Sequence, residues 1–321
     1  MECAVVWRYL CRHIEKLRGL QAENGRTVLL PTDGDTYTMN SSSLRLSVAL
    51  AVAVLSPLAG GAWFYRAQER RMRQDAEKQL QAIVQLKSSQ LAEWRTNRLA
   101  DASMLVESPF FREGVSLWTA NPNDENADRI FAALRPLKQH RGYYDILLLD
   151  AEGRMRLSLS GRPGPPPEEE GPFLAAALRD RKPAISKLHP GRGDLGPYME
   201  VVAPLFIQDG ESSKAIGAVI FQCEARKSLY PLVDYWPIPS LTAETQLIRR
   251  DEGVALLLND LRHQPDTALK LRIPLDREDA PSVMAALGRD GVVKGRDYRG
   301  VEVLSAIIAI PDSPWFLVAK V

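Results

Sequence analysis

Apolar residues follow three different patterns along this chain. From Leu46 to Tyr65, twenty consecutive residues carry no charge. From Ala67 to Glu107, apolar residues recur at steps of three and four among polar helix formers, as in a helix with one apolar stripe. Later, short apolar runs alternate with Gly, Pro and acidic turn residues, a pattern typical of β-strands. The chain is therefore predicted to contain a membrane segment, a long helix and an α+β region.

The uncharged segment 46–65 is long enough to cross a bilayer. At about 1.5 Å per residue, a helix of this length spans a hydrocarbon core of roughly 30 Å. Trp63 and Tyr65 lie at one end, where aromatic side chains favour the membrane interface. The alternative is a cleaved signal peptide, but the segment exceeds the usual apolar core of such peptides. We therefore predict an uncleaved transmembrane helix.

The basic residues that flank this segment suggest an orientation of their own. Arg26 and Arg45 precede it, whereas five basic residues between Arg66 and Lys78 follow it. Taken alone, the positive-inside rule would leave the C-terminal part in the cytoplasm. That rule is weak for long translocated domains, so flanking charge leaves the orientation open.

Residues 1–45 form an N-terminal tail of different character. Within it, Val6, Leu10, Ile14 and Leu17 fit one stripe of a short amphipathic helix. Met39 stands just before the membrane segment. Residues 1–38 are therefore interpreted either as a cytoplasmic tail or as sequence that precedes the true start.

The long helix, assigned to 66–110, carries an apolar stripe of Leu80, Val84, Leu91, Trp94, Ala102 and Leu105. This stripe is longer than packing on one small module requires, so a parallel homodimer along Leu80 and Val84 is predicted. The alternative is that the stripe packs only on the chain's own sheets, and for Leu91 and Trp94 the two interpretations are nearly balanced.

The region after the long helix contains an internal repeat. "AALRDRKPAISKLHPGRGDLGPYMEVVAPL" (176–205) and "AALGRDGVVKGRDYRGVEVLSA" (285–306) share the same order of features. Each follows a hairpin pattern, with turns at Asp150–Gly153 and Asp251–Gly253. One α+β module, with an antiparallel sheet of about five strands, is therefore predicted to occur twice, at 111–236 and 237–321.

A membrane segment, a long helix and two such modules together resemble the double Cache (tandem PAS-like, dCache) sensor domain. The resemblance covers about residues 67–321 and rests on this order, on the hairpins "LLLDAEGRMRLS" and "LIRRDEGVALLLN", on the joining stretch "WPIPSLTAET" and on "SPWFLVAKV". It implies an extracytoplasmic sensor region of a bacterial inner-membrane receptor, of the sensor histidine kinase or diguanylate cyclase type. Such receptors continue into a second span and a cytoplasmic output domain, which the resemblance implies are missing from this chain.

Composition adds few constraints. The net charge is +1, from 41 basic and 40 acidic residues, so neither a nucleic acid nor another polyanion is an expected partner. The three cysteines include only Cys223 beyond the N-terminal tail, and one thiol supports no disulfide framework.

Catalytic motifs are also lacking in the sequence. "GRGDLG" (191–196) matches a dinucleotide fingerprint, but His189–Pro190 precedes it and a strand pattern follows, so the required strand and helix are missing. The four histidines are far apart, and no zinc motif, nucleophile elbow or Walker loop occurs. We therefore expect no catalysis, no metal and no cofactor in this chain.

Polar residues near the first strand run define a candidate ligand site. In the strand from Pro197, alternation places Tyr198 and Glu200 on one face. The candidate ligand-binding residues are Tyr144, His189, Arg192, Asp194, Tyr198 and Glu200. Arg192 would bind a carboxylate, Glu200 or Asp194 an amine, and Tyr198 would pack on the ligand.

The alternative for this site is that Glu200 pairs structurally with Arg192 at a solvated edge. Tyr298 and Trp315, in the second module, are interpreted as packing residues. Two functions follow: a receptor's sensor region that binds a small molecule, or a membrane-anchored interaction scaffold with no ligand.

Overall fold

The structure, a computed structural model, describes residues 41–161, 171–209 and 212–321. The described chain divides into two compact units, one ending at Glu69 and the other comprising Arg70–Val321. The predicted N-terminal helix and the choice between the two starts lie outside the described residues.

Helix α2 (Ser41–Glu107) is continuous over 67 residues and contains Pro57. The predicted membrane segment therefore belongs to the same helix as the predicted membrane-exit segment. By length and composition alone, α2 is the only helix in the described part of the chain that could cross a membrane. The most apolar stretch of this helix is not buried within the described structure.

Two shorter helices follow α2, namely α3 (Pro109–Ala120) and α4 (Asp124–Arg141). Helix α2 ends at Glu107, and Pro109 begins α3, where its missing N–H costs nothing. The Ser108 side chain caps α3 by accepting a hydrogen bond from Phe111 N. Helix α4 ends at Gly142, whose φ of +69° is the left-handed conformation that glycine tolerates.

The first module contains a five-stranded antiparallel sheet with the order β2-β1-β5-β4-β3. Its strands are β1 (Asp145–Leu149), β2 (Met155–Ser158), β3 (Ala184–Ile185), β4 (Tyr198–Asp209) and β5 (Ser212–Glu224), with helix α5 (Gly171–Asp180) between β2 and β3. The turn between β1 and β2 closes with a hydrogen bond from Gly153 N to Asp150 O. The predicted first hairpin and five-stranded sheet are confirmed.

The second module repeats this arrangement with one more strand, in the order β8-β7-β6-β11-β10-β9. Its strands are β6 (Glu244–Asp251), β7 (Val254–Leu257), β8 (Arg272–Pro274), β9 (Gly291–Arg296), β10 (Glu302–Ala309) and β11 (Trp315–Lys320), with helix α8 (Pro281–Ala286) between β8 and β9. The prediction of about five strands is one short here, because β8 adds to the edge beside β7. With three residues, β8 is too brief to give a periodic signal in the sequence.

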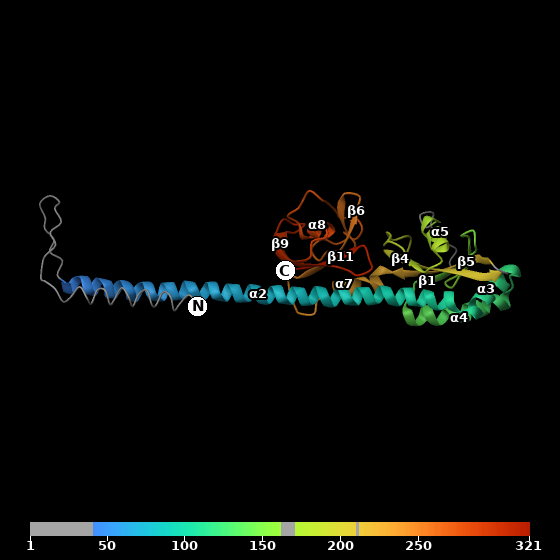
Figure 1. Cartoon of the computed structure of the whole chain (residues 1–321), viewed down its shortest axis with the longest axis horizontal. Helices are drawn as coiled ribbons and strands as arrows, with labels where there is room; N and C mark the ends of the chain where they lie inside the picture. The colour runs from blue at the N-terminus through green and yellow to red at the C-terminus, as the bar shows by residue number, and fades with distance from the viewer. Residues whose placement is uncertain (1–40, 162–170, 210–211) are drawn as a thin grey trace. The chain divides into compact units, whose positions relative to one another are not determined.

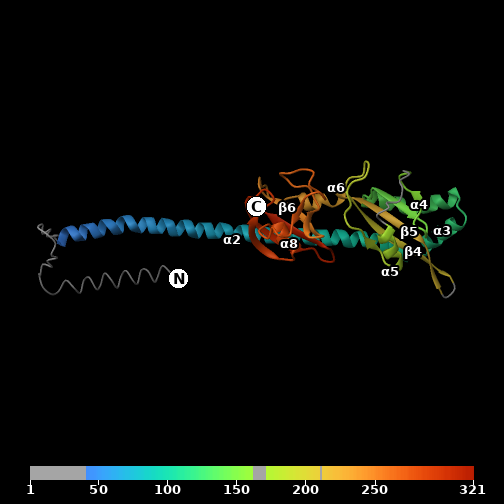
Figure 2. The same cartoon turned by 90° about the horizontal axis from the view of Figure 1, so that it is seen from above.

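Each sheet is covered on both faces. In the first module α2, α3 and α4 cover one face and α5 covers the other, so that α4 and α5 lie on opposite sides of β4 and β5 (Figures 1 and 2). In the second module α2 and α7 (Tyr230–Asp234) cover one face and α8 the other. Helix α6 (Ala225–Ser228) and α7 form the joint between the modules.

The apolar stripe of α2 packs against other parts of the same chain. Leu80, Val84 and Leu91 are at most 3% exposed and pack in one core with second-module residues such as Leu247 and Leu317. The prediction that Leu80 and Val84 form a dimer seam is therefore wrong, because the second module covers them. The length of the stripe matches two modules stacked along one helix.

Candidate ligand site

The α5 face of the first sheet carries a row of three polar side chains. Asp145 on β1 lies opposite Gln222 on β5, and Gln222 lies opposite Glu200 on β4. Directly paired residues of an antiparallel sheet project from the same face. The row therefore lies beside the apolar core formed with α5, in which Leu147 and Val202 are the next residues on the same face.

Glu200 is the most enclosed member of this row, with no exposed surface. Its Oε1 accepts a hydrogen bond of 3.0 Å from Gln222 Nε2. Its backbone N donates to Ser186 Oγ at 2.9 Å, which ties the row to the segment after β3. A carboxylate placed at the centre of a covered sheet is expensive to bury, so its position requires a chemical reason.

Asp145, at the other end of the row, has a local structural role. Its carboxylate accepts hydrogen bonds from Ser158 Oγ at 2.6 Å and from Ser160 N at 2.9 Å. Lys138 Nζ lies 3.7 Å from Asp145 Oδ1. These bonds hold the end of β2 against β1, so Asp145 is fixed in place and contributes negative charge to the row.

The predicted site residues divide into a buried and an exposed group. His189 and Tyr198 are both 5% exposed, and their rings stack with centroids 5.3 Å apart. Arg192 and Asp194 are exposed in a tight turn closed by hydrogen bonds between Arg192 and Leu195. No helix follows this turn, since β4 begins at Tyr198, so "GRGDLG" lacks the helix of a dinucleotide site, as the sequence indicated.

Tyr144 and Glu200 complete the predicted set. Tyr144 is half-buried, and its backbone N donates to Gln222 O at 2.8 Å. Tyr144 thus reaches Gln222 through the backbone, whereas Glu200 reaches it through its side chain. The alternative interpretation, in which Glu200 lies at a solvated edge, is wrong because Glu200 is fully buried whereas Arg192 is exposed.

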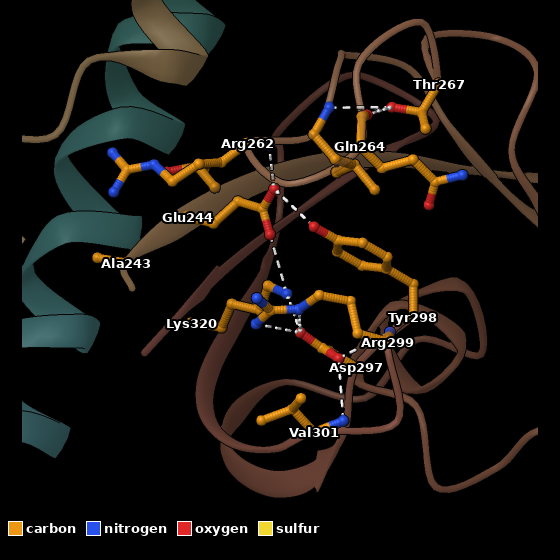
Figure 3. A network of polar contacts seen from close by, with 12 residues as sticks. Ala243, Glu244, Arg262, Gln264, Thr267, Asp297, Tyr298, Arg299, Val301 and Lys320 are labelled. Carbon is orange, nitrogen blue, oxygen red and sulfur yellow. Dashed lines mark hydrogen bonds and ion pairs between the residues drawn. The ribbon is translucent and has the colours of Figure 1, made fainter. Parts of the chain in front are cut away.

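The second module contains a corresponding row with different chemistry (Figure 3). Glu244 on β6 lies opposite Lys320 on β11, and Lys320 lies opposite Ser305 on β10. Lys320 Nζ is 2.9 Å from Glu244 Oε2 and 2.6 Å from Asp297 Oδ2. Lys320 has only 1% of its surface exposed, so this is a buried ion-pair network.

The network extends to the loop between β9 and β10. Arg299 Nη2 lies 2.8 Å from Asp297 Oδ2, and Tyr298 donates to Glu244 Oε1 at 3.4 Å. Lys320 Nζ also lies 4.4 Å from the centre of the Tyr298 ring. Gly300 N donates to Asp297 O, which closes a turn in this loop. Tyr298 and Trp315 pack in the two cores of this module, as predicted.

The pKa values of this network reflect burial and pairing. Burial works to raise the pKa of Asp297, but hydrogen bonds from Lys320 and Arg299 outweigh it and lower that pKa to about 2. Burial raises the pKa of Tyr298 to about 12. Asp297 is therefore an anion, and Tyr298 a neutral hydroxyl, at neutral pH.

The likeness of this chain to known proteins is one of fold. No family model matches it, and neither does any curated protein. The ligand-binding domain of the Pseudomonas aeruginosa PAO1 chemoreceptor PctB, in complex with L-Arg, is 13% identical with a TM-score of 0.53, over 77% of this chain and 95% of that domain. The sensory domain of the Campylobacter jejuni chemoreceptor Tlp3, with isoleucine bound, is 11% identical with a TM-score of 0.55, over 78% and 94%.

A third solved structure is the ligand-binding domain of the P. aeruginosa amino-acid chemoreceptor PctC in complex with GABA. It is 14% identical with a TM-score of 0.50, over 77% of this chain and all of that domain. The chain has the double Cache fold. The expected resemblance is thereby confirmed at the level of architecture.

The two Cache modules differ in the charge of their equivalent rows. Each row runs from the first strand through the last to the strand before it. The first module places Asp145, Gln222 and Glu200 there, with two carboxylates and an amide. The second places Glu244, Lys320 and Ser305 there, so one carboxylate directly faces an ammonium group. An ammonium group supplied by the chain thus occupies the row of the second module.

Sequence reasoning missed Asp145, Gln222 and Lys320. A signal for each was present, since all three are polar residues inside or at the end of apolar strands such as "DILLL", "VIFQC" and "FLVAK". A polar residue in a strand covered on both faces requires a partner. Among the described residues, no group of three His, Cys, Asp or Glu side chains is placed to hold a metal ion.

Proposed function

We propose that this chain is the extracytoplasmic sensor region of a membrane receptor and that its first Cache module binds a small molecule with an ammonium group. The observation that carries the proposal is the buried Glu200 beside Gln222 on the α5 face of a sheet with the double Cache fold. The row that contains them has two carboxylates, and Lys138 lies beside one of them, Asp145. Such a row favours a cationic group.

The ligand class is inferred from two further observations. The solved relatives PctB, PctC and Tlp3 are described with L-Arg, GABA and isoleucine, each of which carries an ammonium and a carboxylate group. Arg192 lies exposed in the loop before β4 and would bind the ligand carboxylate, while Tyr198 and His189 form the adjacent aromatic wall. We therefore propose an amino-acid-like zwitterion.

The receptor's membrane arrangement is part of this proposal. Residues 46–65 would form the transmembrane helix, with the modules at 111–236 and 237–321 outside the cytoplasm, in an inner membrane. A kinase, cyclase or chemotaxis-type output domain would receive the signal, and a homodimer would use surfaces other than Leu80 and Val84. Alkaline phosphatase fused after Val321 should be active. An inactive fusion that is nonetheless stably produced would contradict the orientation.

The ligand proposal can be tested by thermal unfolding of the full chain in detergent micelles. A panel of L-amino acids and GABA is screened, and a true ligand at a hundredfold excess over Kd should stabilise the chain by about 2.7 kcal/mol. Glu200→Gln keeps the side-chain shape but removes the charge, so it should abolish that shift, and Arg192→Ala should reduce it. Exposed Glu152→Gln is the matched control and should behave as wild type.

The scaffold alternative makes the opposite prediction. If the modules carry no ligand, no compound in the panel will shift the unfolding temperature, and Glu200→Gln will alter only the unliganded stability. A ligand whose full stabilisation survives in Glu200→Gln would also contradict the proposed site.

A further inference from the structure

A separate cavity of about 310 Å³ opens at the start of β6 in the second module. It lies among the end of α7, the joining segment and the residues that follow β7. The residues that matter for its chemistry are Asp234, Trp236, Glu244, Thr245, Asp260 and Arg262. Its size is at the lower end of the range for small-molecule sites.

Three carboxylates and one guanidinium group line this cavity. Glu244 is already committed, because Lys320 pairs with Oε2 and Arg262 N donates to Oε1. Arg262 Nη1 is committed as well, since it donates to Ser240 O at 2.7 Å. The carboxylates left to accept bonds from a ligand are therefore those of Asp234 and Asp260.

Neither of these two carboxylates is saturated by the described residues. Asp234 accepts one side-chain hydrogen bond, from Asn259 Nδ2 at 3.1 Å. Asp260 Oδ1 accepts from Ala268 N at 3.1 Å, and its Oδ2 lies 3.9 Å from Arg226 Nη2, which is too long for a hydrogen bond. Both retain capacity to accept bonds from a donor in the cavity.

The Thr245 hydroxyl provides an independent indication of a ligand. Thr245 is 4% exposed, it lines the cavity, and its Oγ1 has no hydrogen-bond partner among the described residues. A buried hydroxyl without a partner is destabilising. A donor that enters the cavity would remove this penalty. The half-buried Trp236 adds an aromatic surface, which favours a cation or an alkyl chain.

We propose that this cavity is a second ligand site, which binds a small organic cation through a primary ammonium group. The ammonium N–H groups donate to Asp234, Asp260 and Thr245 Oγ1, and the alkyl part packs on Trp236. A ligand that donates hydrogen bonds is favoured over an anion, because Asp234 and Asp260 line the cavity and both retain capacity to accept. This site is distinct from the proposed zwitterion site of the first module.

The cavity lies next to the joint between the modules. Asp234 ends α7, and the carbonyl groups of Leu232, Val233 and Tyr235 accept hydrogen bonds from Lys87 of α2. A cation bound by Asp234 thus acts on a helix end that α2 already holds.

The test uses isothermal titration of the full chain in dodecylmaltoside micelles with n-butylammonium, n-butanol and n-butyrate. We expect saturable binding of n-butylammonium, with butanol and butyrate at least about tenfold weaker, because a hydrogen bond to a charged group contributes about 1.5–3 kcal/mol. Asp234→Asn and Asp260→Asn should each weaken the cation at least about tenfold. Thr245→Val should weaken it by a smaller factor, and exposed Asp312→Asn should have no effect.

The outcomes separate this site from the first-module site. Glu200→Gln should leave n-butylammonium binding unchanged while it abolishes the zwitterion response. Binding lost in Glu200→Gln but kept in Asp234→Asn would place the cation in the first module and overturn the second site. Equal affinity for butyrate, absence of saturable binding, or unchanged affinity in both Asp234→Asn and Asp260→Asn would overturn it as well. Thermal unfolding of each variant identifies any loss of fold, and Asp234 is the safer position because it is exposed.

Discussion

Lys320 Nζ lies 2.9 Å from Glu244 Oε2, and the two residues occupy directly paired positions of β11 and β6. The equivalent positions of the first module hold Gln222 and Asp145. The row of the second module thus contains a buried ion pair, whereas the equivalent row of the first module consists of a carboxylate, an amide and a second carboxylate. This difference assigns a structural role to the row of the second module, whereas the row of the first is the one proposed to bind a ligand.

Lys320→Met should destabilise the chain by about 3–5 kcal/mol, because it leaves the buried Glu244 and Asp297 without their shared cation. The measurement is urea unfolding of the full chain in micelles. A matched triple variant, Lys320→Met with Glu244→Gln and Asp297→Asn, removes all three charges and should recover part of the loss. If the triple variant is as unstable as Lys320→Met alone, the loss comes from packing and not from unpaired charge.

Asp297 should make the stability of the chain depend on pH at the acid end. Its pKa is lowered from 3.8 to about 2 in the folded state, since bonds from Lys320 and Arg299 outweigh burial. Between these values the unfolded chain binds more protons, so the stabilising contribution is complete above about pH 4 and is lost as pH falls through 2. Asp297→Asn should flatten this part of the pH profile, which unfolding temperatures from pH 5 to 2 will measure. An unchanged slope would contradict the pairing.

Lys87 should be a stabilising contact between α2 and the joint. Its ammonium group donates to Leu232 O at 2.9 Å and to Val233 O at 2.8 Å, and it also donates to Tyr235 O. Lys87→Met keeps the length of the side chain but leaves these carbonyl groups without a donor, so we expect a loss of about 1–3 kcal/mol. Exposed Lys182→Met is the control. A loss no larger than the control's would show that water replaces Lys87 at this helix end.

Lys87 should also make the stability of the chain depend on pH, but at the alkaline end and because of burial instead of pairing. Burial lowers the pKa of Lys87 from 10.5 to about 8. Between pH 8 and 10.5 the unfolded chain binds more protons, so this group's contribution to stability rises with pH over that window. The difference in unfolding temperature between wild type and Lys87→Met should therefore change from pH 7.5 to 10. A constant difference would indicate that the folded pKa is not lowered.

The burial of Leu80 can be tested by thiol labelling. Leu80 is 1% exposed and Gln81 is exposed. In membranes, Gln81→Cys should react rapidly with a maleimide reagent, whereas Leu80→Cys should be protected because the second module covers it. Denaturation should remove that difference. Equal labelling of the two positions, or a disulfide crosslink at Leu80 between two chains, would restore the dimer seam that the structure excludes.

The sequence alone predicted the elements whose signals are local or repeated. The twenty uncharged residues from Leu46, the three- and four-residue spacing up to Leu105, and the two turns at Asp150 and Asp251 are each readable within one short window. The repeat added the modular organisation, since the same order of helix, loop and strands occurs twice. Candidate residues such as Glu200 followed from alternation within a single strand, and the structure does place Glu200 inside.

The tertiary structure decided what depends on pairing between distant segments. Gln222 meets Glu200 across 22 residues of sequence, and Asp297 meets Lys320 across 23, because strand order and register bring them together. No local pattern encodes either relation. The packing partner of Leu80 and Val84 was likewise ambiguous. An apolar stripe shows that a helix face is covered, but it does not show which surface covers it. The surface that covers Leu80 and Val84 is the second module. This module lies far along the chain from α2, so only the tertiary structure could identify it.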